Sequence, residues 1–280
     1  MKQPENSDYY FEIKPKSSFS LNLKELVEYK ELFYFFTWRD VKVKYKQTAL
    51  GFLWAALQPL VMMLIFTFFM GKAMNIPSDN MEYPIFSFSG LILWTVFSSG
   101  ITNAGNSMVS NAQIIKKIYF PRLIIPISSI LVAVFDFFIA FLILIVLLIA
   151  FQQPVNIFQA LVFWPVGLIL TVISAFGPGC LLAALNVKYR DFRYVIPFLV
   201  QALLFVTPVI YPMSMVTYLW AKYILAINPM YAAITLFRLP MMQREPEMLF
   251  LGISIASGLI LFFIGLAYFR KTEMYFADLA

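Results

Sequence analysis

Long apolar stretches separated by short polar ones make up most of the chain. Six of these stretches are long enough to cross a hydrocarbon core of roughly 30 Å as helices. They cover approximately residues 53–70, 84–109, 123–151, 157–185, 194–211 and 249–269. Pro59 predicts a kink in the first stretch, and Pro165 and Gly177-Pro178-Gly179 predict breaks in the fourth. Since lipid cannot hydrogen-bond an exposed backbone, the pattern predicts an all-α polytopic membrane protein with six transmembrane helices.

Two shorter apolar pieces lie between the fifth and sixth spans, at residues 216–227 and 230–239, and Asn228-Pro229 separates them. Each piece is too short to cross a bilayer alone. We expect an external helical hairpin, either re-entrant or interfacial, whose exposed backbone is covered by protein or water.

The amino-terminal region divides into a polar tail and an amphipathic part. Residues 1–20 carry no apolar run of the signal-peptide type and predict a flexible cytoplasmic tail. Residues 21–50 predict an amphipathic interface helix followed by a basic strip that begins at Trp38-Arg39-Asp40 and suits an anionic membrane surface. An ordinary helix outside the membrane is the alternative. The apolar stripe of the helix consists of Leu26, Tyr29, Phe33 and Phe36.

Composition and charge narrow the class of protein. The chain is 61% hydrophobic and only 13% charged, which excludes a soluble domain of this size. It has no His and one Cys, which excludes disulfides, His metal sites and His-based acid/base catalysis. In the six-span arrangement 17 basic residues lie on one side and 4 on the other, so both termini are expected in the cytoplasm. The net charge of +6 therefore indicates orientation and not nucleic-acid binding.

A basic segment at residues 111–122 joins the second and third spans. Ile114, Ile115 and Ile118 would come together on about one helical turn, and Pro121 is expected to end that helix at Phe120. Such a helix could receive a push from another protein, or it could be a membrane-anchored turn whose lysines snorkel. The candidate docking residues are Asn111, Gln113, Ile114, Ile115, Lys116, Lys117 and Ile118.

Polar residues inside the spans are candidates for a conduit. Asp136 is the one ionisable residue deep inside a predicted span, and it could serve function or make a structural hydrogen bond to a neighbouring helix. In the second span, three polar residues at helical spacing could form a wet wall or could simply pack helices together. The candidate conduit residues are Trp54, Ser99, Asn103, Asn106 and Asp136.

A second basic loop follows the fourth span. It is either another docking surface or only part of the positive-inside pattern. Its candidate residues are Asn186, Tyr189, Arg190 and Asp191. The chain has no GxxxxGK[ST] motif, so transport against a gradient would need an energy source in another chain.

Taken together and in order, several short motifs resemble the membrane subunit of ABC transporters of the type 2 superfamily. The polysaccharide, O-antigen and teichoic-acid exporter permeases are the most similar group. The matching motifs are Trp38-Arg39-Asp40, Tyr45-Lys46, Leu50-Gly51, Trp54, Gln58-Pro59, Asn111 to Lys117, Phe120-Pro121-Arg122, Pro126, Asp136, Asn186, Tyr189-Arg190-Asp191, Thr207-Pro208, Tyr211-Pro212 and Asn228-Pro229.

The resemblance implies a homodimer in a bacterial cytoplasmic (inner) membrane, bound to two ATPase subunits that hold ATP and Mg. Residues 111–120 would be the coupling helix, residues 21–36 the interface or gate helix, and the hairpin containing Asn228 and Pro229 an external gate. Residues 51–272 would form the transmembrane domain and 273–280 a cytoplasmic carboxyl terminus. The implied substrate is a lipid-linked glycan; a small drug-like or lipid substrate is the alternative. A membrane-embedded enzyme would need a cluster of catalytic polar groups near one interface, and the sequence shows none.

Overall fold

The computed structural model describes residues 27–46, 48, 51–189, 191–242, 244–273 and 276, and its regular elements are helices. The predicted tail, Leu26 and Arg190 lie outside the described residues. The elements are α2 (Lys30–Tyr45), α3 (Leu53–Phe66), the π-helical η1 (Thr67–Ala73), α4 (Tyr83–Ser110), α5 (Ala112–Lys117), α6 (Ile124–Ala150), α7 (Ile157–Lys188), α8 (Phe192–Val206), the 3₁₀ turn η2 (Met213–Met215), α9 (Leu219–Ile227), α10 (Met230–Arg238) and α11 (Met248–Glu273).

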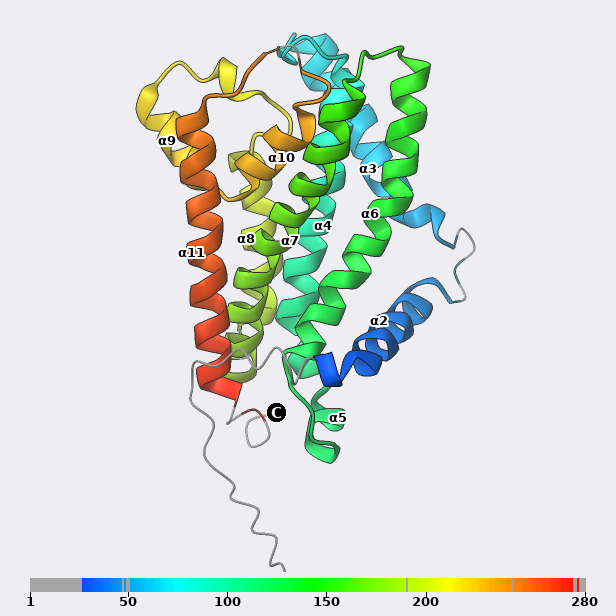
Figure 1. The fold of residues 1–280 in the computed structure, drawn as a ribbon, viewed down its shortest axis with the longest axis vertical. Coiled ribbons are helices and arrows are strands. Elements are labelled where there is room, and N and C mark those ends of the chain that lie inside the picture. The colour runs from blue at the N-terminus through cyan, green and yellow to red at the C-terminus, as the bar shows by residue number, and fades with distance from the viewer. Residues whose placement is uncertain are drawn as a thin grey trace, which may run out of the picture.

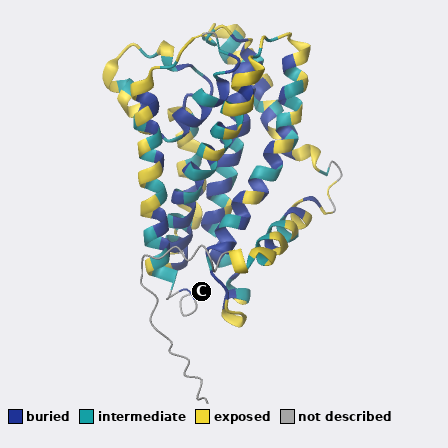
Figure 2. Ribbon diagram, viewed as in Figure 1, coloured by how far each residue is buried: buried dark blue, intermediate teal, exposed yellow. Residues whose placement is uncertain are grey.

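The long helices run side by side as a bundle with two different ends (Figure 1). Helices α2 and α5 lie at one end, which we call the α5 end, and α9 and α10 lie at the other, the α10 end. Helix α4 lies at the centre of the bundle. In its most apolar stretch 78% of the residues are buried, compared with 22% in the helix formed by α3 and η1 (Figure 2). Its small residues allow this position, since a Cβ on Gly100 would already be 3.4 Å from Ala175 of α7.

Five helices among the described residues are long and apolar enough to cross a membrane. The predicted fifth span, residues 194–211, differs from the structure: α8 has 15 residues and ends at Val206. Its length of about 22 Å is shorter than a typical hydrocarbon core. The next four residues, 207–210, are buried and not helical. The helix ends before Thr207, which is extended (φ −92°, ψ 136°), because the ring of Pro208 disfavours the helical conformation of the residue before it.

Helix α7 is continuous through Pro165 and Pro178, so the breaks predicted in the fourth span are wrong. The glycines around Pro178 instead form a close crossing with α11. A Cβ on Gly265 would lie 1.9 Å from the carbonyl oxygen of Gly177, and a Cβ on Gly177 would lie 2.4 Å from the carbonyl oxygen of Leu261. Glycine is thus required here because two backbones touch.

The two short apolar pieces are both helices, as predicted. Helix α10 is enclosed by the bundle, with Met230, Ala233 and Phe237 fully buried. Helix α9 instead exposes Leu219 and Trp220. Of these two helices, α10 therefore lies inside the protein and α9 lies on its surface.

At the α5 end, a hydrophobic cluster joins segments that are distant in sequence. Phe36 of α2, Ile115 of α5 and Phe269 of α11 are all buried in it, together with Phe120 and Phe276. Polar contacts reinforce the cluster: the backbone N–H of Arg122 donates to the carboxylate of Glu273 at 3.1 Å, and the Arg122 guanidinium donates to the Glu273 carbonyl. The last residue of α11 is therefore bonded to the segment that follows α5.

Candidate functional site

A groove of about 790 Å³, lined mostly by polar residues, lies at the α5 end between α2, α4, α5 and α6. Ser99, Asn103 and Asn106 of α4 all line it. Helix α2 contributes Arg39, Asp40, Val43 and Lys44, the α4–α5 junction contributes Ser107, Ser110, Asn111, Gln113 and Ile114, and α6 contributes Ser129 and Val132. The groove thus brings together three of the predicted conduit residues, three of the predicted docking residues and part of the predicted interface helix.

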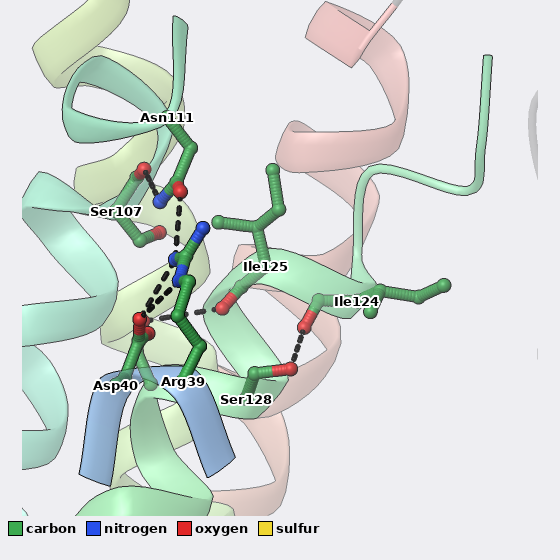
Figure 3. A network of polar contacts seen from close by, with 8 residues as sticks. Arg39, Asp40, Ser107, Asn111, Ile124, Ile125 and Ser128 are labelled. Atoms are coloured by element: carbon green, nitrogen blue, oxygen red, sulfur yellow. Dashed lines mark hydrogen bonds and ion pairs between the residues drawn. The ribbon is translucent and has the colours of Figure 1, made fainter. Parts of the chain in front are cut away.

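Arg39 joins α2 to the junction between α4 and α5 (Figure 3). Its Nε donates to Asp40 Oδ1 at 2.8 Å, and its Nη2 donates to Asn111 Oδ1 at 2.9 Å. The Asn111 amide in turn donates to the Ser107 carbonyl at 2.8 Å. A planar guanidinium can bind both partners at once, which a lysine ammonium does less well. The contact fixes α2 against the start of α5, and we call it the Arg39 clamp.

The α4 wall of the groove contains one amide that is free to meet a ligand and one that is not. Asn103 is exposed. Asn106 donates to the Thr102 carbonyl at 2.9 Å and accepts a hydrogen bond from Asn186 of α7 at 3.0 Å. Asn186 also donates to the Gly105 carbonyl at 3.0 Å and is buried. Asn186 was predicted to lie in a surface loop, and that prediction is wrong, because it is an interior residue that ties α7 to α4.

Asp136 and Trp54 are not part of the groove lining. Asp136 is buried, pairs with Lys44 and accepts a hydrogen bond from the Tyr45 hydroxyl. It therefore fixes the end of α2 to α6, as the structural alternative predicted. Trp54 is 52% exposed on the outside of α3. The five predicted conduit residues thus lie in three different places.

The three isoleucines of the α5 region do not share one face, contrary to the prediction. The helix ends at Lys117, and Ile118 is extended (φ −133°, ψ 134°), so the predicted end at Phe120 is also wrong. Ile115 is 5% exposed within the cluster at the α5 end, whereas Ile118 is 62% exposed. Lys116 and Lys117 are exposed as well. Four consecutive exposed residues, Lys116, Lys117, Ile118 and Tyr119, therefore form an accessible tip at the end of α5, and Gln113 is exposed as well.

Helix α2 differs from the predicted interface helix in its bounds. A turn at Tyr29 precedes it, and it continues through the predicted basic strip to Tyr45. Phe36 is buried and packs on Phe120 with ring centroids 5.6 Å apart, while Phe33 is partly buried. The opposite side exposes Trp38, which stacks on Tyr34 at 6.4 Å and lies under the Lys42 ammonium. Aromatic and cationic side chains in this arrangement suit a membrane–water interface.

Tyr189 and Asp191 flank the turn between α7 and α8. Tyr189 is 48% exposed and follows the last residue of α7, with the Lys188 ammonium 5.0 Å from its ring. Asp191 is exposed and precedes α8. Both remain accessible for the predicted second docking surface.

Arg238 is a buried charged residue at the end of α10, and it is one of the four basic residues that the six-span arrangement places on the less basic side. It is 4% exposed at the end of α10 and donates hydrogen bonds to α4 and to the segment after α8. One signal was available in the sequence: Arg238 lies within the apolar stretch 230–239, and an ionisable residue in such a stretch usually has a specific partner.

Comparisons with known proteins point to one family. A family model described as "ABC-2 type transporter" matches residues 31–242. The chain is 30% identical to an O-antigen export system permease protein RfbA of Klebsiella pneumoniae over 263 residues, which cover 93% of this chain and 99% of that protein. It is 29% identical to RfbA of Myxococcus xanthus over 243 residues, which cover 83% and 90%. It is 25% identical to the polysialic acid transport protein KpsM of Escherichia coli over 246 residues, which cover 84% and 91%.

Proposed function

Because the chain belongs to the ABC-2 type transporter family, we propose that it is the permease subunit of an ATP-driven exporter of a lipid-linked polysaccharide. The relatives named above export O-antigen or transport polysialic acid, and they match the chain over most of its length. This supports a glycan over the small drug-like or lipid substrate. Whichever substrate is carried, the long apolar helices and the family indicate a multi-pass bacterial membrane protein.

The Arg39 clamp is the observation that carries the mechanism. In the proposed complex a cytoplasmic ATPase subunit contacts the tip of α5, and the clamp transmits its movement to α2 at the membrane surface. Two copies of the chain and two ATPase subunits, which bind ATP and Mg, make up the exporter. The basic residues of α2 and α5 support a cytoplasmic location of the α5 end in the inner membrane.

The conduit in this proposal forms between two copies of the permease. Helices α3 and α8 are the candidates for its walls, because only 22% of the apolar stretch formed by α3 and η1 is buried in the single chain and α8 has one buried residue, Ile196. Helix α4 supplies a wall only at the groove, where Asn103 is exposed. Amide and hydroxyl groups there suit the hydroxyls of a sugar chain without requiring a charged substrate.

The test changes the tip of α5 without changing the core. Ile118→Asp alters a residue that is 62% exposed, and Met215→Asp at the α10 end is the matched control at 51% exposure. We expect Ile118→Asp to insert normally, to lose co-purification with the ATPase subunit and to stop surface display of the glycan. Met215→Asp should retain the ATPase subunit. Full export and retained ATPase binding by Ile118→Asp would contradict the docking assignment.

A further inference from the structure

The segment that follows α8 has backbone groups that cannot bond within a helix. Residues 207–210 are buried, Pro208 has no N–H, and the Val209 N–H donates back to the Thr207 carbonyl at 2.7 Å. The carbonyls of Pro208, Val209 and Ile210 therefore need partners from elsewhere, since an unpaired buried carbonyl is costly.

Each of these three carbonyls accepts a hydrogen bond from a side chain. Arg238 Nη1 donates to the Pro208 carbonyl at 3.0 Å, and Arg238 Nη2 donates to the Val209 carbonyl at 2.7 Å. The Tyr83 hydroxyl donates to the Ile210 carbonyl at 2.7 Å. Two residues of α4 and α10 thus complete the hydrogen bonding of the broken end of α8.

The guanidinium of Arg238 is enclosed by α4 on its other side. Its Nη2 also donates to the Phe86 carbonyl at 2.7 Å, its Nε donates to Ser89 Oγ at 3.3 Å, and it stacks on the Phe86 ring at 3.7 Å. Gly90 leaves room for it, because a Cβ there would lie 2.4 Å from Nη2. Among the described residues no carboxylate oxygen lies within 4.0 Å of it.

The direct hydrogen-bond partners of the Arg238 guanidinium are all neutral groups. Breaking a buried ion pair leaves an uncompensated charge, whereas a guanidinium held by carbonyl dipoles can exchange them for other carbonyls or for water. A small cavity of about 50 Å³ lies next to it at the α10 end, where Pro208, Thr235 and Arg238 line it together with the acidic residues Asp79, Glu245 and Glu247. Helix α8 itself has one buried residue, so this segment provides much of its attachment at that end.

We propose that Arg238 is a positioning residue that latches the α10 end of α8 to α4 and α10, and that release of the Pro208 and Val209 carbonyls frees α8 when the conduit opens. The inference rests on the proposed function, in which α8 lines the conduit. It assigns a role to Arg238 in export without contact to the glycan.

The test measures access to the latched segment in the full-length chain. Val209 is fully buried, so Val209→Cys in a Cys180→Ala background reports opening by its reaction with a membrane-impermeant maleimide in proteoliposomes. We expect Arg238→Lys to raise the labelling rate about tenfold or more without ATP, since an ammonium cannot bind all four acceptors at once. The buried native Cys180 of α7, in a chain without the Val209 change, reports general unfolding and should stay unlabelled.

Gly90→Ala provides a second variant that leaves Arg238 in the chain. The added methyl group occupies the position of the guanidinium, so we expect labelling to increase as with Arg238→Lys. Gly252→Ala is the matched control, because nothing lies within 4 Å of its added Cβ. Tyr83→Phe should give a smaller increase, since it frees only the Ile210 carbonyl.

Three results would overturn the latch. In the first, Val209→Cys stays protected from the maleimide in both Arg238→Lys and Gly90→Ala. In the second, Cys180 becomes labelled in parallel, which would mean that Arg238 stabilises the whole fold. Alternatively, adding the ATPase subunit and ATP to the chain with native Arg238 could leave Val209→Cys protected while export proceeds. The ATP-free measurement needs neither ATPase nor glycan, so failure of the latch is distinguishable from loss of ATPase-dependent export, which would contradict the proposed function.

Discussion

The crossing of α7 and α11 gives a sharp prediction about stability. In Gly265→Ala the new Cβ would lie 1.9 Å from the Gly177 carbonyl oxygen and 2.5 Å from its carbonyl carbon. Both atoms belong to the backbone, so no side chain can rotate away. The two helices must separate locally by about 1.5 Å to reach an ordinary van der Waals distance.

The expected free-energy change combines two opposing terms. Overpacking a well-packed site costs about 1–3 kcal/mol, and the upper end applies here because backbone must move. Replacing glycine by alanine inside a helix contributes about 0.8–1 kcal/mol in the stabilising direction. We therefore expect Gly265→Ala to lower the free energy of unfolding by about 2 kcal/mol, which corresponds to a fall in Tm on the order of 5 °C.

Thermal unfolding in detergent, followed by loss of monodisperse protein, measures the change. Gly252→Ala on the same helix is the control, because it has the same helix-propensity gain and no neighbour within 4 Å. It should leave Tm unchanged or raise it slightly. Equal Tm values for Gly265→Ala and Gly252→Ala would refute the reasoning, because they would mean that the two backbones are not in contact.

Three further predictions concern the α5 end. Asp136→Ala removes the acceptor of the Tyr45 hydroxyl and should lower the free energy of unfolding by about 1–3 kcal/mol; an unchanged melting curve would contradict this anchor. Asn111→Ala breaks the Arg39 clamp while Ile115 stays in the core, so surface glycan should fall severalfold at normal protein levels; undiminished export would show that the clamp does not transmit force. Asn186→Leu leaves the Gly105 carbonyl without its side-chain donor and should lower Tm but retain ATPase co-purification, whereas lost co-purification at unchanged Tm would make it a docking residue.

The sequence predicts those parts of the structure that depend on local pattern. Long apolar stretches must form helices in lipid, so the helices α4, α6, α7 and α11 lie close to their predicted bounds. The spacing of Ser99, Asn103 and Asn106 fixes them on one side of α4 whatever its neighbours are, and the groove confirms that they lie together.

Features that depend on a partner from elsewhere in the chain could not be predicted. Pro178 suggested a break, but a packed helix tolerates proline where glycines let another helix approach. Ile115 and Ile118 are equivalent by spacing, and only the position of α5 against the bundle decides which one is buried. The partners of Arg238 come from α4 and the segment after α8, more than 25 residues away along the chain.

The bond between Arg122 and Glu273 has a consequence for biosynthesis. Glu273 leaves the ribosome long after Arg122, with a separation of 151 residues, so the segment after α5 cannot gain this contact during synthesis of the first spans. The surface at the α5 end is therefore completed last, when α11 has inserted. A nascent or prematurely terminated chain without residue 273 lacks this support for the segment after α5.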